Sequence, residues 1–103
     1  DIAASFQAAV VDVLVAKTLR AAENLGARTV AIGGGVAANS YLRSEISAAC
    51  ARKYFRVVLP SLAMCTDNAA MIASAGWHRL ALTGDTALDA GAYPNLGLTV
   101  ASA

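Results

Sequence analysis

Apolar residues at helical spacing dominate the first quarter of the chain. They recur every three or four positions and predict one long helix that ends near Gly26. Val11 and Val15 are also apolar but lie off the main stripe. We therefore expect this helix to be covered on more than one side. The stripe itself consists of Ile2, Phe6, Ala9, Val10, Val13 and Leu14.

Two short runs rich in β-branched residues predict buried strands. The first covers residues 29–32 and is closed by three consecutive glycines at 33–35. The second covers residues 55–59, and Pro60 stops it because proline cannot donate to a sheet ladder.

A helix is predicted after each strand. Asn39 or Ser40 is a suitable N-cap for the first of these helices. Thr66 or Asp67 is suitable for the second, which ends at Gly84. The apolar positions that define the two helices are Leu42, Ile46, Ala49 and Cys50, and then Met71, Ile72, Ala75 and Leu80.

The resulting order is helix, strand, helix, strand, helix. A strand–helix–strand connection of this length makes the two strands parallel neighbours with a right-handed crossover. Two parallel strands are few for a sheet that is normally wider and covered on both faces. The pattern therefore predicts an α/β fold that is part of a doubly wound domain. Residues 85–103 contain Gly, Pro and Asn and are expected to be mostly loop.

The composition supports an incomplete core. The chain has 103 residues, which is enough for one domain. Hydrophobic residues make up 57%, but 25 of them are alanines, which bury little surface. Charged residues make up 15%, against roughly 25% in an ordinary soluble domain. We expect such a chain not to cover all of its own apolar surface.

Charge and residue usage exclude several classes of protein. A net charge of +1 excludes binding to nucleic acid by charge alone. Residues 52–56 do interleave basic and aromatic side chains, which fits an RNA contact and equally a solvated helix end. No uncharged apolar stretch reaches the ~18–20 residues of a membrane span. The start lacks the basic residues of a secretory signal, and two cysteines are too few for a disulfide scaffold, so a cytoplasmic location is expected.

Residues 33–40, the glycine turn, connect the first predicted strand to a helix. In open α/β sheets this is where ligands bind, and glycines let a ligand approach the backbone closely. The following helix presents unpaired N–H groups and a positive dipole end, which suit phosphate. The Asn39 amide can both donate and accept a hydrogen bond, so it could contact a ribose or a phosphate. A tight turn with Asn39 as an ordinary N-cap explains the same residues.

A nicotinamide cofactor fits the glycine turn less well. The spacing of Gly33, Gly35 and Ala38 matches the dinucleotide fingerprint, which requires an acidic residue at the end of the next strand. That strand ends at Pro60, and no carboxylate follows until Asp67.

Residues 65–68, the 65–68 turn, follow the second strand. Parallel strands bring this turn to the same sheet edge as the glycine turn. The Asp67 carboxylate could hold a divalent or transition metal beside bound phosphates. Taken alone, it is more simply a helix cap or a partner of the helix dipole. His78 lies about three turns further along the helix, too far to share a metal with Asp67.

Residues 30–43, which include the three glycines and Asn39, resemble the adenosine motif of the actin-like ATPase superfamily. They are more closely similar to that of the tRNA N6-adenosine threonylcarbamoyltransferase family. Residues 65–73 resemble the late metal-binding motif of this family. Residues 1–7 resemble the helix that precedes the adenosine motif, and residues 93–96 resemble the C-terminal end. The two motifs stand at the family's interval, and the resemblance covers nearly the whole chain.

The resemblance implies that residues 1–103 form a C-terminal fragment of an actin-like ATPase (ribonuclease H-like) domain. Family members transfer threonylcarbamoyl from threonylcarbamoyl-adenylate to N6 of the adenosine 3′ of the anticodon in tRNAs that read ANN codons. They bind one iron or zinc ion. By the match, Gly34 and Gly35 would open the backbone to the adenylate, Asn39 would contact it, and Asp67 would be a metal ligand. No catalytic residue is assigned.

The chain also departs from the family pattern. The paired metal-binding histidines and the first phosphate loop belong to an earlier domain, so the isolated chain is expected to hold neither metal nor activity. Gly33 is an additional glycine that could alter the loop. The implied partners are tRNA, proteins of the same modification pathway and the N-terminal part of the protein, without a membrane. Alternatives are a metal-dependent O-sialoglycoprotein endopeptidase (a label the family has carried), a non-catalytic actin-like assembly module and another actin-like ATPase such as a sugar kinase.

Overall fold

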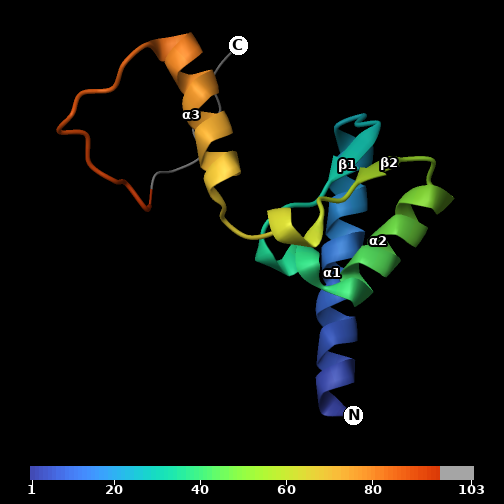
Figure 1. Cartoon of the computed structure of the whole chain (residues 1–103). Coiled ribbons are helices and arrows are strands. Elements are labelled where there is room, and N and C mark those ends of the chain that lie inside the picture. The colour runs from blue at the N-terminus through green and yellow to red at the C-terminus, as the bar shows by residue number, and fades with distance from the viewer. Residues whose placement is uncertain (96–103) are drawn as a thin grey trace.

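The computed structural model describes residues 1–95 and follows the predicted order of elements (Figure 1). A 3₁₀ helix precedes each of the last two α-helices. The elements are α1 (Ile2–Asn24), β1 (Thr29–Ala31), η1 (Gly35–Ala38), α2 (Ser40–Arg52), β2 (Arg56–Val58), η2 (Leu62–Met64) and α3 (Ala69–Thr83).

The two strands form a parallel sheet, as predicted. Each is slightly shorter than expected, because regular pairing joins only Thr29–Ala31 to Arg56–Val58. Ile32 continues the pairing with one bond, in which its N–H donates to the Val58 carbonyl at 3.1 Å. Val30 and Val57 are paired and are the more buried residues of their strands, whereas their neighbours in both strands are exposed. One face of the sheet is therefore covered by the described residues and the other is not.

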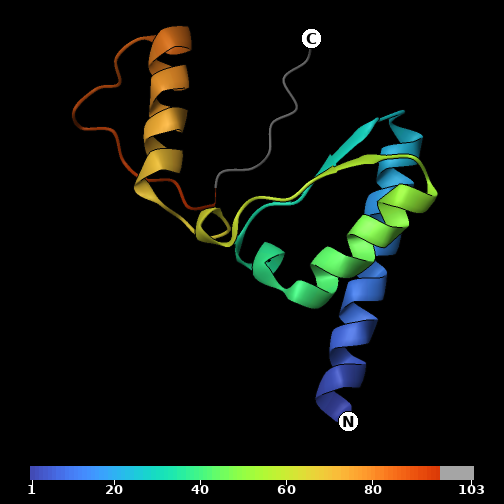
Figure 2. The ribbon, with the colours of Figure 1, turned by 45° about the vertical axis from the view of Figure 1, so that its right-hand side comes forward.

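Helices α1 and α2 lie side by side on that covered face (Figures 1 and 2). The face of α1 that packs into the core is the one off the main apolar stripe: Val11, Leu19 and Ala22 are buried. The stripe itself is exposed, with Phe6 71% and Val13 52% accessible. The sequence predicts a helix covered on more than one side; the described residues cover one side and leave the main apolar stripe exposed. The buried core cluster consists of Leu19, Ala22, Val30, Ile46, Ala49 and Cys50.

Both packed helices end in the same way. The residue after each C-cap has a left-handed backbone, Gly26 with φ 62° and Tyr54 with φ 59°. In each case the next amide bonds back to the last turn: Ala27 N–H donates to the Ala22 carbonyl, and Phe55 N–H to the Cys50 carbonyl, both at 2.9 Å. This is the Schellman arrangement, which satisfies carbonyls that a helix end leaves unpaired. At both helix ends, this arrangement turns the chain sharply into the strand that follows.

Helix α3 stands apart from this core (Figure 2). None of its residues is buried, and Ile72 and Trp77 are 63% and 71% accessible. It ends at Gly84, as predicted. The predicted N-cap, Thr66 or Asp67, is wrong: the cap is Asn68, whose Oδ1 accepts a hydrogen bond from Met71 N–H at 2.9 Å.

The shape is extended for the chain length. The radius of gyration is 17.2 Å, against about 13 Å for a compact domain of 100 residues. Residues 85–95 contain no helix or strand. Residues 96–103, including the last residue of the 93–96 motif, lie outside the described residues.

Helix α1 is long and apolar enough to cross a membrane by length and composition, with a mean hydropathy of 1.6 over 18 residues. A core helix of a soluble protein meets the same criterion. The absence of a membrane partner therefore stays a prediction.

Candidate functional site

The glycine turn follows β1, and the space around its backbone is open. Gly34 has φ 84°, a left-handed backbone that favours glycine. Gly33 and Gly35 have no such requirement, and no atom lies within 4 Å of where a Cβ at either position would sit. Neither the backbone nor the packing of the described residues therefore explains why these two positions are glycine. The turn has room for a ligand or for another protein segment against its backbone.

Asn39 caps α2. Its Oδ1 accepts a hydrogen bond from Leu42 N–H at 3.0 Å, and its Nδ2 donates to Gln7 Oε1 of α1 at 3.3 Å. The capping role considered from the sequence is thus confirmed. The second amide hydrogen and the half-buried position leave Asn39 able to contact a ligand at the same edge.

Asp67 lies in the 65–68 turn at the same edge of the sheet, because β1 and β2 are parallel. Its side chain is exposed. Since Asn68 caps α3, the carboxylate of Asp67 is not used as an N-cap. This removes one of the two ordinary roles that a carboxylate at this position could have.

Arg43 connects the two turns, and sequence reasoning assigned it no role. Its Nη1 donates to the carbonyl of Ala37 in η1, and its Nη2 donates to the carbonyl of Pro60 after β2, each at 2.8 Å. Nη1 also lies 3.8 Å from Cys65 Sγ. No residue type in the sequence marks this role, because both acceptors are backbone carbonyls.

A small cavity of about 170 Å³ opens beside the glycine turn. Its walls come from α1, the glycine turn and α2, and they are mostly apolar. They include Leu14, Gly33, Val36, Leu42 and Ile46.

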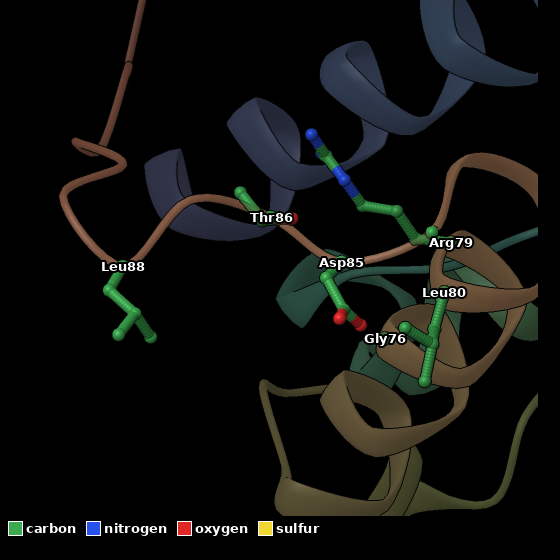
Figure 3. A pocket seen from close by; sticks show the side chains of 7 residues that line it. Gly76, Arg79, Leu80, Asp85, Thr86 and Leu88 are labelled. Atoms are coloured by element: carbon green, nitrogen blue, oxygen red, sulfur yellow. The ribbon is translucent and has the colours of Figure 1, made fainter.

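A larger hollow of about 630 Å³ lies at the far end of α3, between the helix and the segment that follows it (Figure 3). Gly76, Arg79 and Asp85 are among its lining residues. It contains none of the residues predicted to bind a ligand or a metal.

The described residues do not by themselves make a metal centre. Within residues 1–95, no three His, Cys, Asp or Glu side chains come together in a way that could hold an ion. Asp67 is therefore one candidate ligand, and a complete site requires donors from elsewhere. His78 lies on α3, well along the helix from Asp67.

The basic and aromatic segment at 52–56 forms the end of α2 and the start of β2. Lys53 makes an ion pair with Glu23 of α1. Tyr54 is 96% accessible, whereas Phe55 packs against the core. Arg52, Tyr54 and Arg56 are exposed, which a solvated helix end and an RNA contact both require.

The structure therefore defines an α/β chain in which two strand-to-helix turns share one sheet edge and are joined by one arginine. The model of the tRNA N6-adenosine threonylcarbamoyltransferase family matches residues 1–74, which include both turns. The chain belongs to this family.

Individual relatives are similar in sequence to this chain over most of its length. A tRNA N6-adenosine threonylcarbamoyltransferase of Thermosipho africanus is 48% identical over 98 residues, covering 93% of this chain and 29% of the relative. Those of Paracidovorax citrulli and Symbiobacterium thermophilum are 58% and 50% identical over 80 and 102 residues, covering 78% and 97% of this chain and 23% and 29% of the relatives. The chain thus spans less than a third of the length of these relatives.

Proposed function

We propose that this chain is the C-terminal, adenylate-binding part of an enzyme that transfers threonylcarbamoyl to N6 of an adenosine in tRNA. The observation that carries the proposal is the family match over residues 1–74, which includes both turns. The names of the relatives support a transferase rather than an endopeptidase. In this proposal the domain has the actin-like ATPase fold, and other parts of the protein cover the open face of the sheet.

The glycine turn would hold the adenylate. Gly34 and Gly35 leave the backbone open, and the N-terminus of α2 directs unpaired N–H groups and a positive dipole end toward a phosphate. Asn39 would use its amide on the ribose or the phosphate while its Oδ1 continues to cap α2. The apolar cavity beside Gly33 would accept the less polar part of the nucleoside.

Asp67 would supply one ligand to an iron or zinc ion whose other ligands come from outside this chain. Its exposure and its freedom from capping support this role. Such an ion, when bound, would polarise the carbonyl under attack. The further partners are tRNA and proteins of the same modification pathway, in the cytoplasm.

Binding of AMP to the full-length protein that carries this segment tests the role of Asn39. Asn39→Ser keeps a good N-cap and loses the amide, whereas Asn39→Ala loses both. We expect both variants to weaken AMP binding by roughly tenfold, about the value of one hydrogen bond to a charged group. If only Asn39→Ala changes the affinity, and it does so together with the melting temperature, Asn39 is a cap and nothing more.

Gly35→Ala tests the open backbone in the same assay. The structure accepts a Cβ at Gly35 without a clash or a strained φ, so the melting temperature should not fall. We expect AMP binding to weaken because the methyl group occupies the space of the ligand. Gly76→Ala, in the exposed helix α3 with equally open surroundings, is the matched control and should leave AMP binding unchanged.

Metal content tests the role of Asp67. We expect Asp67→Ala to lower the metal bound per molecule of the full-length protein, measured by elemental analysis. Asp85→Ala, which removes another exposed carboxylate, is the control. An unchanged metal content in Asp67→Ala would reject this ligand.

A further inference from the structure

We propose that Arg43 is a positioning residue that holds the glycine turn and the 65–68 turn at a fixed separation. In its consequence for ligand binding, this inference rests on the proposed function. The two turns are separated along the chain by all of α2 and β2. Arg43 is the side chain that hydrogen-bonds to the backbone on both sides of that gap, at Ala37 and at Pro60.

The chemistry of the guanidinium fits this task. Its two terminal nitrogens form a rigid planar fork, so two carbonyls bound by one group are held in a defined geometry. The first acceptor belongs to Ala37, which has no accessible surface, so its carbonyl depends on a partner from the protein. The second belongs to Pro60, just before η2 and the 65–68 turn.

Cys65 extends the connection into the 65–68 turn. Its side chain is 2% accessible, and its Sγ lies 3.8 Å from Arg43 Nη1 and donates to the Ser61 carbonyl at 3.4 Å. Helix α3 has no buried residue. The position of the 65–68 turn relative to the glycine turn therefore depends on β2 and on this small set of contacts, with Arg43 at its centre.

The lysine and methionine variants of Arg43 separate positioning from general stability. Met removes the donors, and Lys keeps the charge but offers a single nitrogen instead of a fork. Arg52, exposed at the other end of the same helix, provides the control variant Arg52→Met.

The two cysteines of the chain report on the two regions separately. Cys65 lies beside Arg43, whereas Cys50 lies in the hydrophobic core and is 1% accessible. Rates of thiol alkylation at each cysteine, measured by mass spectrometry on this chain, distinguish local release from unfolding. With Arg43→Met we expect Cys65 to react roughly tenfold faster or more, as a lost hydrogen-bonded tie would allow, while Cys50 changes little.

Equal acceleration at both cysteines in Arg43→Met would mean that Arg43 acts on overall stability, and this would overturn the proposal. Unchanged reactivity at Cys65 would also overturn it. If Arg43→Met does not fold, Arg43→Lys carries the same test. Arg52→Met should alter neither rate.

The consequence for ligand binding is tested in the full-length protein. We expect Arg43→Met to weaken AMP binding by roughly tenfold, comparable to the loss of a ligand contact, although the guanidinium of Arg43 is held by the Ala37 and Pro60 carbonyls. Wild-type protein that does not bind AMP would reject the proposed function and leave the thiol result standing. Wild-type protein that binds AMP, with Arg43→Met binding it equally well, would reject the positioning role in the site.

Discussion

Two strand–turn–helix units follow one another in this chain, β1–η1–α2 and β2–η2–α3. Each has a three-residue strand, a short 3₁₀ turn and an asparagine that caps the next helix. The caps are almost identical: Asn39 Oδ1 accepts from Leu42 N–H at 3.0 Å, and Asn68 Oδ1 accepts from Met71 N–H at 2.9 Å. The helices differ in packing, because α2 buries four residues and α3 buries none.

The difference shows which structural features local sequence signals determine and which depend on packing partners. The turn and the helix cap form in both units from their own residues, and the two strands pair with each other. Only the helix of the first unit finds a packing partner in the described residues, since α2 packs against α1 and the sheet, whereas in the second unit β2 contributes to the core and α3 does not. In the second unit, Arg43 ties the turn, but no element within residues 1–95 covers the helix. The second unit therefore has a defined local structure and a site residue, Asp67, without a core of its own.

The largest expected effect is on the free energy of unfolding, when one isoleucine in α2 and one in α3 are replaced by alanine. Ile46→Ala removes a side chain that is 1% accessible, and we expect a loss of about 2–5 kcal/mol in the free energy of unfolding. Ile72→Ala, at 63% accessible, should change it by less than about 0.5 kcal/mol. Urea unfolding of this chain measures both. Similar losses for the two variants would show that α3 is packed in solution.

The two caps give a smaller effect. Asn39→Ala should lower the free energy of unfolding by about 1 kcal/mol, because α2 unfolds together with the core. Asn68→Ala should speed amide hydrogen exchange within α3 and leave the global unfolding free energy unchanged. The comparison would fail if Asn68→Ala shifted the global transition as much as Asn39→Ala does.

These contrasts also show how far the sequence could predict the structure. The glycines at 33–35, Pro60 and Gly84 delimit the elements, and the connection length predicts parallel strands; the structure agrees on each of these points. The cap of α3 was misassigned because Thr66, Asp67 and Asn68 are three consecutive residues of capping type. Only the backbone conformation selects among them.

The packed face of α1 and the role of Arg43 lie beyond sequence reasoning for a different reason. Helix α1 has two apolar faces, and nothing in its residue order indicates which one meets α2 and the sheet. Arg43 bonds to carbonyls, which every residue carries, so no residue type marks its partners. The candidate site residues Gly34, Gly35, Asn39 and Asp67 could be placed at one sheet edge, but their assigned contacts come from the family resemblance.

The smallest effect concerns pH and depends on the buried thiol of Cys50. Burial raises the pKa of the Cys50 thiol above its usual value. Above about pH 8.5 the unfolded chain loses this proton while the folded chain keeps it, so stability is complete below that pH and declines as pH rises toward the folded pKa. Urea unfolding from pH 7 to 10 should show this decline, and Cys50→Ala should reduce its slope. An equal slope in Cys50→Ala would assign the pH dependence to other groups.

The central claim is that the two turns form one site in a tRNA-modifying transferase. Threonylcarbamoyl transfer tests it most directly: the full-length, metal-loaded protein with its partners is incubated with threonylcarbamoyl-adenylate and tRNA, and the nucleosides are identified by mass spectrometry. We predict N6-threonylcarbamoyladenosine with the wild type and the Asp85→Ala control, and a loss of most of it with Asp67→Ala. No product from the wild type, or undiminished product from Asp67→Ala, would contradict the account.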